Sequence, residues 1–201
     1  MATRYYDDAV TEKIKRWVKD EKMTILKPSE STRLFQLLAD EKNDAKLTLP
    51  LIAISRDGGF EIVNTQKKAL TYDGGHIAAN VEKSQVLNGI PIKLNYQLDI
   101  YCKYFAEADE YVRNFIFNLI NYPTVHIEIP YNDAKIIHDS TIILESNVAD
   151  NSDIKERLIS GQFTRMTIRF TIDDAYLFSV PFMDNWNVEY SDEIVIYGGE
   201  K

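Results

Sequence analysis

Alternating apolar and polar residues form the strongest pattern in the chain, and they predict a long β-strand over residues 92–104. One side of this strand carries Ile92, Leu94, Tyr96, Leu98, Ile100, Cys102 and Tyr104. The other side carries Lys93, Asn95, Gln97, Asp99, Tyr101 and Lys103. We therefore expect one face of the strand to be buried against the core of the protein.

The following segment, residues 107–120, changes to helical spacing. Acidic residues cluster at its start, where the positive end of a helix favours them. Its apolar stripe consists of Ala108, Val112, Phe115, Ile116, Leu119 and Ile120. Tyr122-Pro123 ends the helix, and residues 124–130 alternate again. These patterns predict a strand–helix–strand unit whose helix lies on the sheet.

Upstream of this unit, the pattern predicts several shorter elements. Residues 7–20 have the spacing of an amphipathic helix, with Asp7 and Asp8 near its start. Residues 23–27 favour a short strand that Pro28 ends, and residues 29–40 favour a second, shorter helix. Residues 47–56 and 60–63 are β-rich and flank Asp57-Gly58-Gly59, which predicts a hairpin. Residues 64–88 show no sustained period and predict a long irregular excursion.

Downstream, residues 136–146 and 163–172 predict two more strands, and residues 186–197 a final pair of short ones. A capping-box pattern at residues 153–156 predicts a short helix that Gly161 closes. Together the elements predict an α+β fold, with a mostly antiparallel sheet of about five or six strands and helices packed on one face. We expect an N-terminal helical segment at residues 1–46 and an α+β sheet domain at 47–201, forming one compact domain.

Composition narrows the functional classes. The 201 residues include 31 acidic and 23 basic ones, and the resulting net charge of −8 opposes nucleic-acid binding as the main role. No apolar stretch approaches the roughly 20 residues needed to cross a bilayer, and the N-terminus lacks a signal-peptide pattern. Cys102 is the single cysteine, which excludes an internal disulfide and fits a reducing compartment.

Motifs for catalysis, metal binding or phosphate binding are missing from the sequence, so we predict no catalytic residue, cofactor site or metal site. His76, His126 and His138 are too far apart to suggest a ligand pair, and Cys102 falls on the apolar side of its strand. The glycine pairs lack the residues that complete a phosphate loop, and residues 150–153 lack the glycine and distal glutamate of a calcium loop. Asp173, Asp174 and Asp99, which faces outward on its strand, are expected to be solvated.

The polar face of the predicted sheet is the candidate interaction surface. It carries Lys93, Lys103, Arg165, Arg169 and Tyr101. Such a face can stay in water, or a neighbouring subunit can cover it, and tyrosine is enriched at such contacts. We therefore expect these five residues to line an inter-subunit or lumen-facing surface.

Two other functional classes remain open. A small hydrolase or ligand-binding domain would use the neighbourhood of Asp99, His126 or His138. A nucleic-acid-binding module would use the basic residues of the polar face, with Arg165 and Arg169 on the same side of one strand.

With this order of elements, the segment IPIKLNYQLDIYCKYFAEADEYVRNFIFNLINYPTVHIEIP at residues 90–130 resembles the neck and tail-completion proteins of tailed bacteriophages. The tail terminators of contractile-tailed phages are the most similar group. The resemblance covers residues 48–173. It lies in the pattern of hydrophobic and polar residues and in the order of the elements, with no invariant motif. The segment before Leu47 departs from the family pattern, which leaves a baseplate, sheath-contacting or head-completion role as the alternative.

The resemblance implies a structural, non-enzymatic virion protein located in the tail or neck, and in the host cytoplasm during assembly. It implies a homo-oligomeric ring, commonly a hexamer, that caps the tail tube and sheath and docks to the head connector. DNA would only pass through the channel, where a net acidic protein avoids salt-dependent adhesion to phosphates. No cofactor and no membrane contact are implied.

Overall fold

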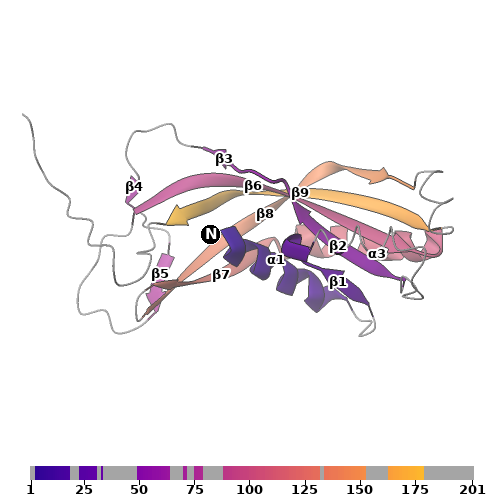
Figure 1. The fold of residues 1–201 in the computed structure, drawn as a ribbon, viewed down its shortest axis with the longest axis horizontal. Coiled ribbons are helices and arrows are strands. Elements are labelled where there is room, and N and C mark those ends of the chain that lie inside the picture. The colour runs from indigo at the N-terminus through magenta and orange to yellow at the C-terminus, as the bar shows by residue number, and fades with distance from the viewer. Residues whose placement is uncertain are drawn as a thin grey trace, which may run out of the picture.

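The computed structural model describes residues 3–18, 23–30, 33, 49–63, 70–71, 75–78, 88–131, 134–152 and 163–178 (Figure 1). Most of the helix expected at 29–40 lies outside these residues, apart from a 3-10 turn at Pro28–Glu30. The helix expected from residue 153 and the strands expected at 186–197 lie outside them entirely.

The fold is α+β, as the sequence predicts. Its two described α-helices are α1 (Thr3–Trp17) and α3 (Phe105–Asn121). Its strands are β1 (Thr24–Leu26), β2 (Leu51–Arg56), β3 (Glu61–Ile62), β4 (Leu70–Thr71), β5 (Gly75–Ala78), β6 (Asn88–Cys102), β7 (Thr124–Tyr131), β8 (Ala134–Asp150) and β9 (Thr164–Phe178). The sheet runs in the order β1-β2-β6-β9-β8-β5, while β3 and β4 pair with β6 and β7 pairs with β8. Among the described strands, β1 and β2 are parallel and every other pair is antiparallel.

The centre of the sheet is the long pair β6–β9, whose apolar sides face the same way. Leu98 pairs with Ile168 and Tyr96 with Phe170, and all four side chains are buried. The predicted strand therefore exists with the predicted buried face. It ends at Cys102, however, so Tyr104 is 63% exposed and does not belong to the apolar side.

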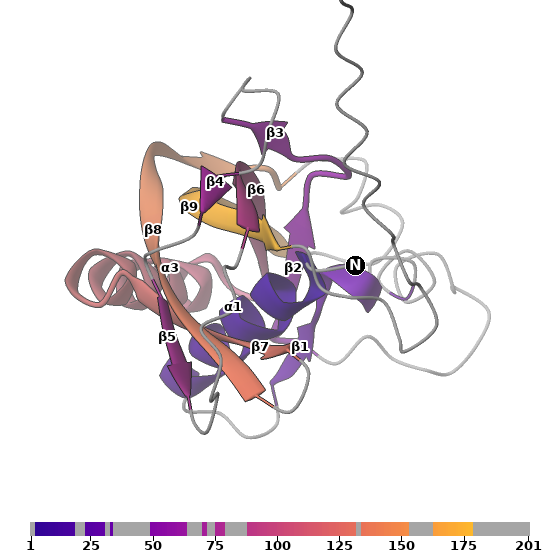
Figure 2. The ribbon, with the colours of Figure 1, turned by 90° about the vertical axis from the view of Figure 1, so that its left-hand side faces the viewer.

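Both helices cover this apolar face, and the sheet curls around them (Figure 2). Tyr6, Val10 and Ile14 of α1 share one core cluster with the sheet and with the buried stripe of α3. That stripe consists of Ala108, Val112, Phe115 and Leu119. Ile120, expected on the stripe, is instead 62% exposed. The region 1–46 thus contributes α1 to the core and β1 to the sheet.

The predicted hairpin at residues 47–63 is wrong. Arg56 of β2 pairs with Tyr96, and Glu61 of β3 pairs with Lys93. Both strands are therefore antiparallel to β6 and lie one after the other along it, instead of pairing with each other. Because β6 is 15 residues long, it satisfies the backbone hydrogen bonds of both segments, and no fold-back is needed. The irregular excursion at 64–88 also contains two short strands that the sequence pattern did not indicate, β4 and β5.

Strand β8 belongs to two parts of the sheet and changes partners in its middle. Residues 134–141 pair with β7, and the residues from Ile142 onward pair with β9. At the change, the backbone N–H of Thr141 donates to both carboxylate oxygens of Asp174, each at 3.0 Å. One extra residue of β9 between Ile172 and Ala175 forms a β-bulge opposite β6 there. The carboxylate of Asp174 therefore replaces a strand partner where the two parts of the sheet separate.

A partly buried ion pair fixes α1 to the sheet. Asp7 Oδ1 accepts a hydrogen bond from Arg56 Nε at 2.8 Å and another from the hydroxyl of Tyr96 at 2.9 Å. Because α1 begins at Thr3, Asp7 and Asp8 lie beyond its first turn, so their expected role at the helix start is wrong. Burial raises the pKa of Asp7, and the hydrogen bond from Tyr96 and the charge of Arg56 oppose that rise.

Removing the cation of this pair is expected to destabilise the fold. Arg56→Met leaves a carboxylate that is 13% exposed without its counter-charge, so we expect a loss of about 1–3 kcal/mol in the free energy of unfolding. Urea denaturation measures it. The control is Lys27→Met, because Lys27 and Asp8 form a more exposed pair, worth about 0–1 kcal/mol. Equal losses of unfolding free energy in the two variants would contradict the conclusion that the Asp7–Arg56 pair fixes α1 to the sheet.

Candidate assembly surface

The polar face of the β6–β9 pair lies on the side of the sheet away from the helices. Residues next to each other in a strand point to opposite faces, and Leu98 and Ile100 belong to the core that the helices cover. Asp99 and its neighbours two residues away therefore face the other side. The register places Gln97 opposite Arg169, Asp99 opposite Thr167, and Tyr101 opposite Arg165.

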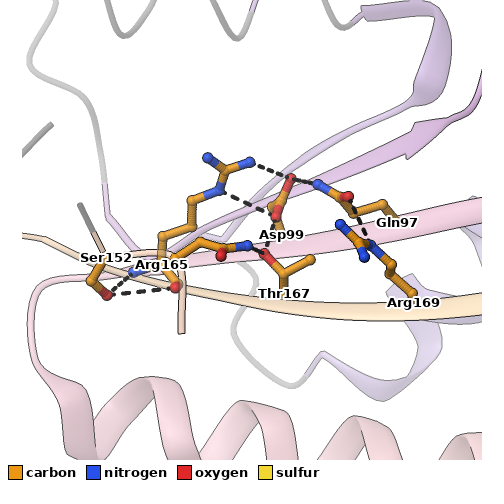
Figure 3. Close-up of polar contacts among 7 residues, drawn as sticks. Gln97, Asp99, Ser152, Arg165, Thr167 and Arg169 are labelled. Atoms are coloured by element: carbon orange, nitrogen blue, oxygen red, sulfur yellow. Dashed lines mark hydrogen bonds and ion pairs between the residues drawn. The ribbon is translucent and has the colours of Figure 1, made fainter. Parts of the chain in front are cut away.

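Asp99 is the centre of a hydrogen-bond network on this face (Figure 3). Arg165 donates from Nε and Nη2 to the two carboxylate oxygens, at 3.2 and 3.1 Å. Thr167 donates from its hydroxyl at 2.6 Å, and Gln97 donates from its amide at 2.8 Å. With four donors and 3% exposure, the carboxylate is a structural centre and is not the solvent-facing group that the sequence predicted.

Tyr101, one of the five predicted surface residues, is 2% exposed, so its place on an exposed surface is wrong. The physical reason is a second small core on this face. Tyr101 packs edge-on against Phe163, and the guanidinium of Arg165 lies 5.6 Å from the centre of its ring. This second core consists of Leu26, Leu51, Ala53, Tyr101 and Phe163.

The other four predicted residues differ in what they can contact. Arg165 is held by Asp99, and Lys93 lies 3.5 Å from the carboxylate of Asp173. Lys103 is exposed in the turn after β6, and its ammonium lies 5.4 Å above the ring of Tyr104. Arg169 is exposed and donates to the side chain of Gln97 at 3.4 Å. The structure therefore places Arg169 and Lys103 where a partner can reach them.

The outer face of α3 is a second accessible surface, which the sequence analysis did not identify. Phe117 is 65% exposed and Ile120 is 62% exposed, while Asp109, Glu110 and Arg113 are also exposed. These five residues fall within one side of the helix by their spacing. The sequence signal was present in Phe117, an apolar residue outside the predicted buried stripe.

An open groove of about 560 Å³ lies beside this helix. Trp17 of α1 and Tyr111, Asn114 and Phe117 of α3 line it, together with Glu107, Glu110 and Arg113. Asn114 donates from its side-chain amide to the backbone carbonyl of Trp17 at 3.1 Å, which ties the two helices together at the groove.

The histidines with described side chains lie in different environments. His126 is exposed on β7, and its Nδ1 lies 2.5 Å from Asp139 across the strand pair. His138 is 4% exposed on the core side of β8, and its Nε2 donates to the backbone carbonyl of Asp174 at 2.9 Å. The ring also lies edge-on to Tyr6 and Tyr176. Burial lowers the pKa of His138, and the hydrogen bond to Asp174 and the nearby carboxylates partly offset this.

The remaining candidate groups, Cys102, Asp173 and Asp174, are buried or have partners within the fold. Cys102 is buried, and burial raises the pKa of its thiol to about 12, so the thiolate is disfavoured near neutral pH. Asp173 pairs with Lys93, and Asp174 accepts hydrogen bonds from Thr141. Within the described part of the chain, no three potential ligands are grouped to hold a metal ion. None of its helices has the length and apolar character that crossing a membrane requires.

Comparison with known proteins does not assign a family. No family model matches the chain, and no curated protein matches it.

The Asp99 network predicts unequal effects for two arginines on one strand. Arg165→Met leaves a buried carboxylate without its bidentate cation, so we expect a loss of about 3 kcal/mol in unfolding free energy. Arg169→Met removes an exposed side chain and is expected to change stability by less than about 0.5 kcal/mol. Chemical denaturation of both variants checks this, and similar effects would contradict the central role of Asp99.

His138 predicts a loss of stability in acid. Its folded-state pKa lies below the unfolded value of 6.5, so the folded protein binds fewer protons than the unfolded chain. Stability should therefore fall as pH drops through 6.5 toward the folded-state pKa. Denaturation at pH 7.5 and pH 5.5 should show a smaller difference in His138→Gln than in the wild type. His126→Gln serves as the control, because its ring lies in solvent. If the stability difference between the two pH values were unchanged in His138→Gln, His138 would not be the source of the acid destabilisation.

Proposed function

We propose that the chain is a structural virion protein: a ring-forming tail terminator or neck subunit of a tailed phage. It would cap the tail tube and sheath and dock to the head connector. The observation that carries the assembly part of this proposal is the outer face of α3, where Phe117 and Ile120 are each more than 60% exposed. Large apolar side chains grouped on one exposed face are typical of contact sites between proteins. The tail or neck placement rests on the resemblance of residues 90–130.

The positions of the polar residues favour assembly over catalysis. Asp99 and His138 lie on opposite faces of the sheet, and each is held by hydrogen bonds of the fold itself. The hydrolase alternative needs such groups to meet at one accessible place. Other virion roles remain alternatives to the terminator: a baseplate, sheath-contacting or head-completion protein would need the same kind of exposed contact surface.

The charge of the chain also suits a channel subunit. A net charge of −8 weakens the attraction of phosphates, so DNA passing through a ring of such subunits would meet little adhesion. Within the Asp99 network, Arg165 is neutralised by its carboxylate partner, which reduces the basic character of the polar face. These two features disfavour the nucleic-acid-binding alternative.

The test is the oligomeric state of the purified full chain. We expect closed rings, with six copies as the leading stoichiometry, in native mass spectrometry and in negative-stain images that show a central hole. Measurements over a range of protein concentrations separate a specific ring from open-ended aggregation. A protein that stays monomeric at every concentration would refute the proposal, as would the turnover of a small substrate.

A further inference from the structure

We propose that two copies of the chain associate through α3, with their helices antiparallel and related by a two-fold axis. The contact surface, which we call the α3 seam, consists of Ala106, Glu110, Arg113, Phe117 and Ile120, all of which are exposed. This inference goes beyond the proposed function, since it concerns a contact between two copies that can form whether or not a ring closes.

The α3 seam follows from the spacing of its residues along the helix. Successive members are separated by four, three, four and three positions, which is the spacing of residues that line the contact between two coiled helices. The buried stripe of α3 packs on the sheet on the opposite side of the helix. In Figure 2, α3 lies at the periphery of the fold. A second helix can therefore lie along the α3 seam while the buried stripe stays in the core.

The centre of the α3 seam carries one charge of each sign. Glu110 and Arg113 are both exposed, and among the described residues neither takes part in a hydrogen bond or an ion pair. A charged group from a second molecule can therefore bind either side chain without first displacing a partner within the described fold.

Antiparallel pairing about the midpoint between Glu110 and Arg113 matches the α3 seam with itself. Glu110 of each copy then lies opposite Arg113 of the partner subunit, and the two-fold axis produces this ion pair twice. Phe117 of each copy lies opposite Ala106 of the partner subunit, so a large side chain meets the smallest one of the seam. Both copies thus contribute the same surface, as an isologous contact requires.

Other arrangements of two α3 helices lack this match. Parallel helices would bring equivalent positions together, with Glu110 opposite Glu110 and Arg113 opposite Arg113. An antiparallel shift by seven residues would place Glu110 opposite Ile120 in one direction, and Arg113 opposite Lys103 in the other. Like charges that face each other suppress a pairing, and a carboxylate against an apolar side chain loses water without gaining a partner. Charge therefore selects one orientation and one register.

The two other charged residues of α3 do not meet like charges in this register. Asp109 flanks the α3 seam on one side, where the antiparallel geometry brings it opposite Ile116 of the partner subunit. Glu107 flanks the seam on the other side and comes opposite Asn114 of the partner subunit. Arg113 is thus the charged group of the partner's helix that lies opposite a carboxylate.

The proposed contact is small, because it uses one helix from each copy. Stable interfaces between proteins bury about 1,200–2,000 Å² in total. Some apolar surface lies next to the α3 seam: Trp17 and Tyr111 line the groove beside it, and Tyr104 is exposed in the turn before the helix, where Ile120 of the partner subunit would lie. We therefore expect reversible dimers whose population depends on protein concentration.

Charge reversal tests the pairing. Glu110→Arg and Arg113→Glu each place like charges opposite each other at both symmetric positions, so each should weaken self-association at least about tenfold. The double variant, Glu110→Arg with Arg113→Glu, keeps the net charge and restores an ion pair at both positions, so it should associate like the wild type. Sedimentation velocity over a range of protein concentrations measures the association.

The matched control for charge reversal is Asp57→Arg, which makes the same change of charge at an exposed residue outside the α3 seam. It should associate like the wild type, and thermal unfolding verifies that all variants are folded. A double variant that stays as weak as the single variants would overturn the pairing, because the α3 seam would then contact a different surface.

Disulfide cross-linking tests the register. An equal mixture of Ala106→Cys and Phe117→Cys should form a mixed disulfide dimer with oxidised glutathione, because these two positions lie opposite each other. Either variant alone should not, since two copies of one position lie roughly 16 Å apart along the helix axes, beyond the reach of a disulfide. The natural Cys102 is buried and serves as the background in both variants. Equal cross-linking of a single variant would overturn the antiparallel register.

The outcomes separate this inference from the proposed function. Dimers without rings, with the expected effects of charge reversal, support the pairing and refute the proposed function. Rings that are insensitive to charge reversal and form no mixed disulfide overturn the pairing alone. Rings that contain the mixed disulfide support both, with a second contact elsewhere on the subunit, because a two-fold contact joins copies only in pairs. A wild type that stays monomeric at every concentration refutes both.

Discussion

The structure depends on burying one continuous apolar face, formed mainly by the long strands β6 and β9, under two helices. Burial of such surface is the main favourable contribution to folding, and most of the largest buried side chains among the described residues belong to that single cluster. The helices can cover the face only because their own apolar stripes match it. The outer side of α3 is consequently left to polar, charged and scattered apolar residues, and the other side of the sheet to polar residues and the second small core around Tyr101.

Three carboxylates have their hydrogen-bond partners within the fold, and each lies where two secondary-structure elements meet. Asp7 joins α1 to β2 through Arg56, Asp174 holds β8 where it changes partners, and Asp99 links β6 to β9. A buried charge without partners costs several kcal/mol, so the partners of Asp7 and Asp99 stabilise the contacts between the elements that carry them.

Assembly is the activity that we propose for the remaining surface, because Phe117 and Ile120 are large apolar side chains exposed on the outer face of α3. The outer face of α3 and the polar face of β6 and β9 are carried by elements that pack on each other through the core, so their relative positions are set by the same packing that stabilises the fold.

The sequence by itself determined the α+β class, the strands around Ile100, Ile127 and Ile168, and the helix that ends before Pro123, because these depend on periodicity within one segment. Only the tertiary structure decided that β2 and β3 both follow β6, that Tyr101 is buried by Phe163, and that Ile120 is exposed. For the candidate surface, the sequence placed Arg165 and Arg169 on one face. Only the structure shows that Arg165 is held by Asp99, whereas Arg169 makes a long contact with Gln97. Strand pairing and side-chain burial depend on residues that are distant in the chain. Local alternation does not tell which distant segment packs against a given strand.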